Sequence, residues 1–205
     1  LLLTLIFCLS FTTEKKRAFT IFMIGDSTMA NKNLTGGNPE RGWGQMLPVF
    51  FSANIKIDNH AVNGRSTKSF IDEGRWEQVL QKINPGDYVF IQFGHNDQKP
   101  DTERHTEPGS TYDANLQRFV SETRAKGGIP VLFTSIIRRH FNEEGTLIDT
   151  HGAYLDATRK GASVIKVPLI DLNRPTHDWV MEVGDAPTRA DLLWARAQTL
   201  PCRPE

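Results

Sequence analysis

The chain has 205 residues, which is long enough for one domain with a substantial hydrophobic core. Its 24 basic and 24 acidic side chains cancel to a formal net charge of zero. Because no block of basic residues stands out, the sequence does not favour nucleic acid or another polyanion as a partner. The six histidines are scattered and no cysteine pair is spaced for zinc, so we expect neither a metal nor a cofactor.

Residues 1–11 form an apolar run that is too short to span a bilayer as a helix. Such a run at the N-terminus is typical of a secretory signal peptide, here without its basic leader. We therefore predict a signal-peptide remnant over residues 1–17, a secreted or periplasmic protein, and no stable membrane insertion after cleavage. Cleavage would remove Cys8 and leave Cys202 without a partner for an intramolecular disulfide. The alternative interpretation is a buried strand or helix.

The apolar run at residues 19–24 ends abruptly in Gly25-Asp26-Ser27. This pattern predicts a buried parallel strand followed by a tight turn. Ligands of open α/β sheets bind beyond the carboxyl ends of the strands, so Ser27 is placed to act as a nucleophile. Two alternatives remain open: Ser27 caps the next helix, or the turn that it forms with Thr28 binds a phosphate at a helix N-terminus.

The rest of the chain alternates between helical and extended patterns. Apolar residues at helical spacing predict helices near residues 43–50, 76–83 and 112–120, and Pro48 must kink or end the first of these. Further strands are expected at residues 55–57, 87–93, 129–137 and 163–172. This alternation predicts one α/β domain with a five-stranded parallel sheet, right-handed crossovers and helices on both faces.

Three of these strands end in small or polar residues, namely Gly25-Asp26-Ser27, Asn63-Gly64-Arg65 and Gly94-His95-Asn96-Asp97. In a doubly wound sheet such ends meet in one crevice. Ester cleavage builds negative charge on the carbonyl oxygen, and fixed hydrogen-bond donors around that oxygen lower the barrier. The backbone N–H groups of Ser27 and Gly64 and the side-chain NH₂ of Asn96 would supply three donors, and a glycine at position 64 allows close approach of the substrate.

These segments resemble the SGNH/GDSL hydrolases and, within them, the rhamnogalacturonan acetylesterase-like branch. The resemblance is carried by GDSTMA at 25–30, GWG at 42–44, AVNGRS at 61–66, EGRW at 73–76 and FGHND at 93–97. It implies a flavodoxin-like, three-layer α/β/α fold and the hydrolysis of acetyl esters on pectic polysaccharide. It also implies that Ser27 is the nucleophile and that Gly64 and Asn96 belong to the oxyanion hole. The G-x-S-x-G elbow of ordinary α/β-hydrolases is absent.

The sequence departs from the family in its catalytic base. The family places its general base and orienting acid together near the C-terminus as Asp-x-x-His, and none of the six histidines here has Asp three places before it. Asp149-Thr150-His151 has the wrong spacing, so we expect Asp149 or Thr150 to cap a helix. His177 is a low-probability substitute for the base. We therefore predict weak or no activity, with a non-catalytic carbohydrate-binding protein as the alternative function.

Family resemblance fades from about residue 186, and the remainder is rich in Arg, Ala and Pro. We predict a hydrolase domain over residues 18–185 and an atypical tail over residues 186–205, as a truncated or frameshifted C-terminus would produce. The fold would then be incomplete at its C-terminus, with part of the sheet uncovered. A divergent C-terminal helix is the alternative.

Several residues near the predicted crevice have supporting roles in this interpretation. Asp26 and Asp97 are expected to hydrogen-bond loop backbone and hold the crevice in shape. His95 is expected to contact the substrate or shape its loop, and not to act as a base. Arg65 could meet an acidic sugar or form a surface ion pair. The oligomeric state stays open.

Overall fold

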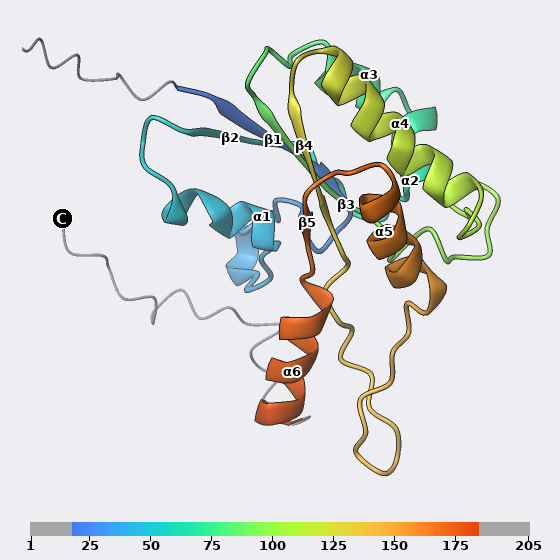
Figure 1. Cartoon of the computed structure of the whole chain (residues 1–205). Coiled ribbons are helices and arrows are strands. Elements are labelled where there is room, and N and C mark those ends of the chain that lie inside the picture. The colour runs from blue at the N-terminus through green and yellow to red at the C-terminus, as the bar shows by residue number, and fades with distance from the viewer. Residues whose placement is uncertain (1–17, 185–205) are drawn as a thin grey trace, which may run out of the picture.

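The computed structural model of the chain describes residues 18–184 (Figure 1). The signal peptide predicted for residues 1–17 and the tail predicted for residues 186–205 lie outside these residues. No helix within the described part combines the length and apolar character needed to cross a membrane.

The centre of the molecule is a five-stranded sheet in which all neighbouring strands are parallel. Its strands are β1 (Thr20–Gly25), β2 (Lys56–Asn59), β3 (Tyr88–Gln92), β4 (Ile129–Phe133) and β5 (Leu169–Ile170), in the order β2-β1-β3-β4-β5. The predicted parallel sheet is therefore confirmed. Because β2, β1 and β3 are neighbours and run parallel, the loops that follow these three strands leave from one edge of the sheet.

Helices cover the two faces unequally. One face carries α2 (Thr67–Asp72), α3 (Arg75–Leu80), α4 (Thr111–Ala125) and α5 (Ala153–Val164), as Figure 1 shows. The other carries the short helix α1 (Trp43–Met46) and the 3₁₀ helix η2 (Leu47–Phe50), after a 3₁₀ turn η1 (Thr35–Gly37). Helix α6 (Asn173–Val183) follows β5 and lies near the carboxyl edge. The layers are those of a three-layer α/β/α fold.

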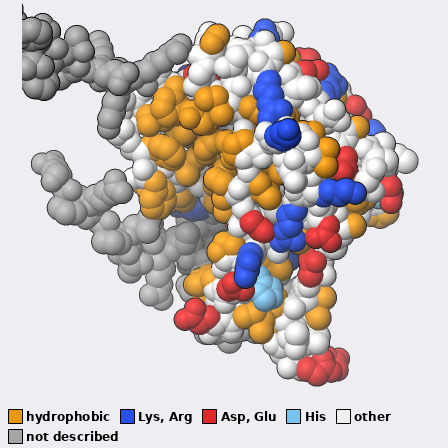
Figure 2. Space-filling view, viewed as in Figure 1, with side chains coloured by type: hydrophobic (Ala, Val, Ile, Leu, Met, Phe, Trp, Pro, Cys, Tyr) orange, Lys and Arg blue, Asp and Glu red, His pale blue; other side chains and the backbone are white. Residues whose placement is uncertain are grey.

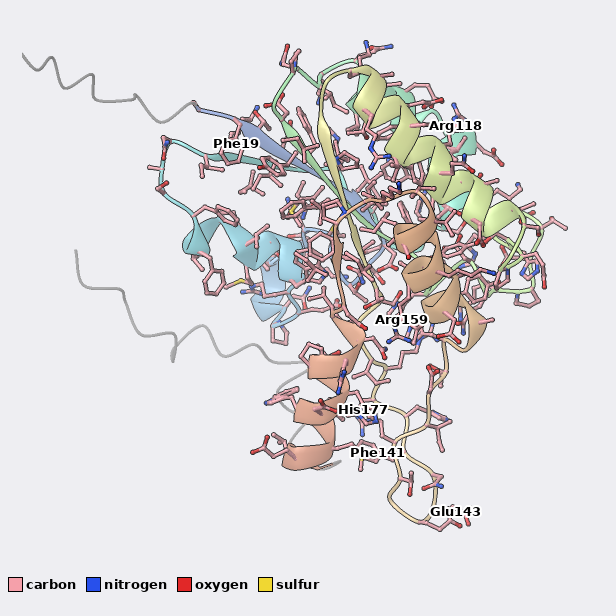
Figure 3. The ribbon with its side chains drawn as sticks, in the orientation of Figure 1. Phe19, Arg118, Phe141, Glu143, Arg159 and His177 are labelled. Carbon is pink, nitrogen blue, oxygen red and sulfur yellow. The ribbon has the colours of Figure 1, made fainter. Side chains whose placement is uncertain are left out.

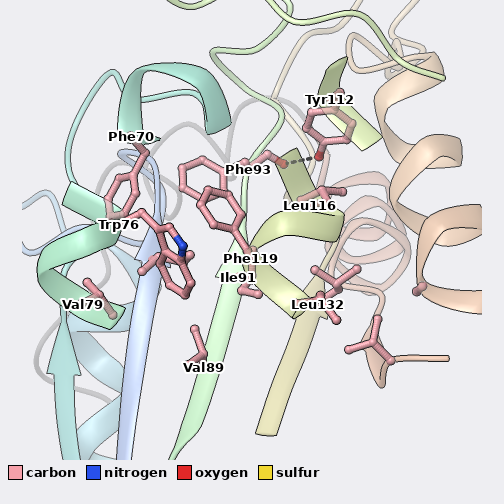
Figure 4. Packing of buried hydrophobic residues seen from close by; sticks show 14 of the residues in the cluster. Phe70, Trp76, Val79, Val89, Ile91, Phe93, Tyr112, Leu116, Phe119 and Leu132 are labelled. Atoms are coloured by element: carbon pink, nitrogen blue, oxygen red, sulfur yellow. Dashed lines mark hydrogen bonds between the residues drawn. The ribbon is translucent and has the colours of Figure 1, made fainter. Parts of the chain in front are cut away.

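Aromatic side chains form the core beneath helices α2 to α5 (Figure 4). Phe119 of α4 lies 5.0 Å from the ring of Trp76 and 5.6 Å from that of Phe93, measured between ring centroids. Phe22 and Ile24 of β1 face this cluster. The intervening residues of the strand point to the opposite face, since side chains alternate along a strand. A strand buried on both sides explains the continuous apolar run in the sequence.

The second face is apolar but less deeply covered by the described residues. Tyr88 and Phe90 are only partly buried there, and Val49 and Phe50 of η2 are 63% and 62% exposed. Figure 2 shows hydrophobic side chains gathered over this side of the molecule. A large apolar area exposed in this way is uncommon on a soluble monomer.

The fifth strand differs from its prediction. The strand predicted for residues 163–172 is wrong at its start, because α5 continues to Val164 and β5 comprises only Leu169 and Ile170. Tyr154, Thr158 and Ala162 follow one another at intervals of four residues and are buried, which extends one helix face into that segment. The predicted break at Pro48 is confirmed, because α1 gives way to η2 where this proline enters.

The core packing yields a prediction. Phe119→Ala removes a fully buried ring and should lower the free energy of unfolding by about 3–5 kcal/mol. Phe50→Ala is the matched control, because its ring is mostly exposed and its loss should cost less than about 1 kcal/mol. Urea unfolding of both variants beside the parent measures the difference. Equal losses would contradict the assignment of Phe119 to the core.

Candidate active site

The candidate nucleophile lies in a turn that is anchored by its neighbour Asp26. The Oδ1 atom of this buried carboxylate accepts hydrogen bonds from the backbone N–H of Thr28 at 2.9 Å and from its hydroxyl at 2.8 Å. The backbone N–H groups of Met29 and Ala30 both donate to the Asp26 carbonyl. Ser27 itself is half-buried at this turn. The chain therefore reverses immediately after β1 and keeps Ser27 accessible.

Two glycines allow neighbouring backbone segments to pack closely against this turn. A Cβ atom at Gly25 would lie 2.7 Å from the carbonyl oxygen of Gln92, so β1 and β3 could not keep their spacing. A Cβ atom at Gly42 would lie 2.1 Å from the carbonyl oxygen of Ala30. The backbone N–H of Trp43 donates to the Thr28 carbonyl at 2.8 Å. The GWG motif is thus a backbone support for the turn that carries Ser27.

The loop after β2 reaches the same edge through Gly64. This residue has φ of +78°, a conformation that glycine adopts without a steric penalty. A Cβ atom there would meet nothing within 4 Å, so the space beside it is open. The side-chain NH₂ of Asn96 donates to the Arg65 carbonyl at 3.0 Å. This bond brings together the loops that carry Gly64 and Asn96.

A second buried carboxylate, that of Asp97, fixes the loop after β3. Its Oδ1 atom accepts from the backbone N–H of Thr67 at 3.0 Å and from the Thr106 hydroxyl at 2.9 Å. Its Oδ2 atom accepts from the backbone N–H of Gly94 at 3.1 Å. The expectation that Asp26 and Asp97 hydrogen-bond loop backbone is therefore confirmed.

A buried histidine pair lies beside this arrangement. His95 Nδ1 is 3.3 Å from His151 Nε2, and the two ring centroids are 4.4 Å apart. The same Nδ1 atom is 3.7 Å from Asp26 Oδ2, which is too long for a hydrogen bond. Arg138 donates to the His95 carbonyl at 2.7 Å and to the Thr150 hydroxyl at 3.1 Å. His95 thus connects the loop after β3 to Arg138 and to His151, which lies just before α5.

His151 and Arg138 are the residues that sequence reasoning missed. The predicted helix cap by Asp149 or Thr150 is wrong, because Gly152 precedes α5 and no side chain caps it. Asp149 accepts instead from the backbone N–H of His151 at 2.8 Å. The Asp-Thr-His triplet was a usable signal, but nothing in the sequence linked it to His95, which is 56 residues away.

Burial controls the protonation of these groups. It lowers the pKa of both His95 and His151 to about 3, and it raises the pKa of both Asp26 and Asp97 to about 6. A general base works best with a pKa near the operating pH. Neutral His95 is therefore a weak base, and its contacts suit it to holding the loops in place.

Within residues 18–184 no histidine hydrogen-bonds to the Ser27 hydroxyl. His177, the low-probability substitute for the base, lies on α6 close to the loop that carries Phe141 (Figure 3). Its Nδ1 atom is 3.1 Å from Asp178 Oδ1. The described residues also contain no group of three or more His, Cys, Asp or Glu side chains that could ligate a metal ion.

The two carboxylates should respond differently to neutralisation. The pKa of Asp26 is raised from 3.8 to about 6, so its stabilising contribution is complete below pH 3.8 and is lost as the pH rises through 6. Asp26→Asn keeps an acceptor for Thr28 and should raise the free energy of unfolding at pH 8 by about 1–2 kcal/mol. The gain should vanish near pH 4.

Asp97→Asn is the matched comparison. Both carboxylate oxygens of Asp97 accept hydrogen bonds, so an NH₂ group must face a donor, and stability should fall by about 1–3 kcal/mol. Urea unfolding at pH 4 and pH 8 measures both variants. Equal responses of the two variants would show that the hydrogen bonds do not distinguish these sites.

The buried pair of His95 and His151 predicts that the folded protein loses stability in acid. The folded pKa values of about 3 lie below the ordinary value of 6.5, so stability is complete above pH 6.5 and declines as the pH falls toward 3. His151→Gln removes one titrating ring and should flatten the decline in unfolding free energy between pH 7 and pH 5. His177→Gln, at a half-exposed site, should leave the slope unchanged. An unaltered slope in His151→Gln would show that protonation of His151 does not cause the loss of stability in acid.

The sequence and fold were compared with known proteins. Residues 23–194 match the GDSL-like Lipase/Acylhydrolase family, and this match includes residues 186–194 of the predicted tail. The rhamnogalacturonan acetylesterase RhgT of Bacillus subtilis (strain 168) is 38% identical over 190 residues, which are 93% of this chain and 80% of that protein.

Solved structures agree with this likeness. The crystal structure of YxiM from Bacillus subtilis has a TM-score of 0.74 and 29% identity, covering 85% of this chain and 49% of that one. The acetylxylan esterase Axe2 of Geobacillus stearothermophilus shares the fold, with a TM-score of 0.60 and 21% identity over 82% of this chain and 83% of its own. The chain therefore belongs to the GDSL-like lipase/acylhydrolase family, in its rhamnogalacturonan acetylesterase-like branch, and is an ester hydrolase by family.

Proposed function

We propose that this chain carries the nucleophile and the oxyanion hole of an acetylesterase that removes O-acetyl groups from pectic polysaccharide. The observation that carries the proposal is the hydrogen bond from Asn96 to the Arg65 carbonyl, which ties two donor-bearing loops together at the edge where β1 delivers Ser27. The identity with RhgT, a rhamnogalacturonan acetylesterase, supports the choice of substrate. Export, as predicted from residues 1–11, would bring the protein to a polysaccharide outside the cytoplasm.

The proposed reaction has two steps. The Ser27 oxygen attacks the acetyl carbonyl carbon and loses its proton to a base, while the carbonyl electron pair moves onto oxygen. The N–H groups of Ser27 and Gly64 and the NH₂ of Asn96 would stabilise that oxyanion. Its collapse expels the sugar oxygen, which takes the proton, and leaves an acetyl group on Ser27. Water then releases acetate by the same sequence of bond changes.

Each step needs a base, and the 205 residues contain no Asp-x-x-His to supply one. Burial holds the pKa of His95 at about 3, which makes it a poor proton acceptor. We therefore propose that a polypeptide of these residues alone hydrolyses esters weakly or not at all. The same observation favours a second candidate function, a carbohydrate-binding protein that keeps the loops but not the chemistry.

Added imidazole provides the test, because a small base can enter where a histidine side chain is lacking. We expect p-nitrophenyl acetate hydrolysis by the 205-residue chain to match that of Ser27→Ala without imidazole. With imidazole present, the parent should exceed the variant severalfold, since Ser27 then has a proton acceptor. The variant corrects for hydrolysis by imidazole itself.

The outcomes separate the candidates. Equal rates for the parent and Ser27→Ala, both with and without imidazole, would rule out Ser27 as the nucleophile and leave the carbohydrate-binding candidate. A parent rate far above that of Ser27→Ala before imidazole is added would show that a residue of the chain already serves as base. His177→Ala would then identify or exclude His177.

A further inference from the structure

Asn63 lies in a tight turn beside the candidate oxyanion hole and directly precedes Gly64. The turn is closed by the backbone N–H of Arg65, which donates to the Val62 carbonyl at 3.4 Å. Asn63 is exposed, and it is the one asparagine of the 205-residue sequence that is followed by glycine. The glycine nitrogen of such a pair can attack the side-chain amide carbon of the asparagine, because no side chain shields that nitrogen.

The side-chain amide of Asn63 is held by a buried lysine. Lys32 Nζ lies 2.9 Å from Asn63 Oδ1, and the lysine side chain is only 4% exposed. Glu40 lies 3.3 Å from the same Nζ atom, but its side chain is 54% exposed, so water screens that pair. An ammonium group at an amide oxygen stabilises the negative charge that this oxygen gains when the amide carbon is attacked.

The peptide bond that supplies the attacking nitrogen is also polarised by a cation. Arg65 Nη1 donates to the Asn63 carbonyl at 2.9 Å. When the Gly64 nitrogen loses its proton, the negative charge is shared with this carbonyl oxygen, where the guanidinium stabilises it. Glu73 accepts from Arg65 Nε at 3.1 Å and also from Arg75. One carboxylate is thus shared by two guanidinium groups, and the positive charge is not cancelled.

The turn leaves room for this attack. Within residues 18–184 no acceptor takes a hydrogen bond from the Gly64 N–H, so the loss of its proton breaks no bond. A Cβ atom at Gly64 would meet nothing within 4 Å. Gly64 and Arg65 also line a polar cavity of about 450 Å³, which gives water access to the turn.

We propose that Asn63 is a site of spontaneous deamidation that Lys32 and Arg65 promote. The Gly64 nitrogen gives up its proton and bonds to Asn63 Cγ, the Cγ–Nδ2 bond breaks, and the leaving NH₂ takes a proton and departs as ammonia. The product is a five-membered cyclic imide. Water then opens the ring and returns a proton to the Gly64 nitrogen. Attack of water at Cγ gives aspartate, and attack at the backbone carbonyl carbon gives isoaspartate.

This modification alters a donor of the candidate oxyanion hole. The imide carries no hydrogen on the Gly64 nitrogen, and isoaspartate adds one carbon to the main chain before Gly64, which displaces its N–H. Aspartate keeps the main chain but places a carboxylate next to the oxyanion, where like charges repel. This consequence rests on the proposed esterase function, whereas the chemical change does not.

Peptide mapping by mass spectrometry, after incubation of the full chain at pH 8, tests the site. We expect Asn63 to show the mass change of NH₂ replaced by OH. Isoaspartate should be among the products, and it identifies the imide because direct hydrolysis of the amide gives aspartate alone. Asn142 is also exposed but is followed by Glu143, so it is the internal control and should change far more slowly.

Variants test the two cations. Lys32→Gln keeps a donor for Asn63 Oδ1 without the charge and should slow the modification severalfold, as should Arg65→Gln. Arg124 donates to two carbonyls at the distant end of α5, so Arg124→Gln is the matched control and should leave the rate unchanged. Circular dichroism checks that each variant is folded. Arg65→Gln, at a partly exposed site, provides the test if Lys32→Gln does not fold.

Three results would overturn the proposal: an Asn63 that changes no faster than Asn142, aspartate without isoaspartate, or equal rates in the parent, Lys32→Gln and Arg65→Gln. Modified chains, separated by anion exchange, should lack the imidazole-supported hydrolysis of unmodified chains. Equal hydrolysis by both would show that Gly64 is not an oxyanion donor. No hydrolysis by either would count against the proposed function and not against the modification.

Discussion

The loops at the carboxyl edge of the sheet depend on one buried carboxylate, that of Asp97. Three segments donate to it: the start of α2 through Thr67, the long loop before α4 through Thr106, and its own turn through Gly94. A polar group removed from water must be satisfied by such donors, or its burial is strongly unfavourable. Asp97 thus holds these three segments together, and Asn96 lies next to it in the chain.

The same edge illustrates how function and stability conflict. Asp26 Oδ2 and His151 Nδ1 are buried and find no hydrogen-bond partner among the described residues. Such groups reduce stability, so a sequence selected only for folding would avoid them. The aromatic cluster around Phe119, which lies beneath helices α2 to α5, offsets this cost. The carboxyl edge of the sheet can therefore hold buried polar atoms that lack hydrogen bonds, because the apolar interior stabilises the fold.

Much of the fold was predictable because it is encoded locally. The apolar run before Gly25 predicts β1, and the polar ends of three strands predict which loops meet. Prediction failed where packing between distant segments overrides a local pattern. Residues 163–164 belong to a helix because α5 packs against α4, although their sequence is compatible with a strand. His151 and Arg138 were missed for a similar reason, since both contact His95, which is distant from them in the sequence.

The close contact at Gly42 has a consequence for how the protein can diversify. Ala30 and Gly42 are held together at the two ends of a connection whose residues 33–37 are exposed. Loop closure costs little more as a loop lengthens, so insertions between fixed ends are tolerated. This segment can gain or lose residues while the turn at Ser27 stays in place. Evolution can therefore alter the surface beside the candidate site without rebuilding the turn that carries Ser27.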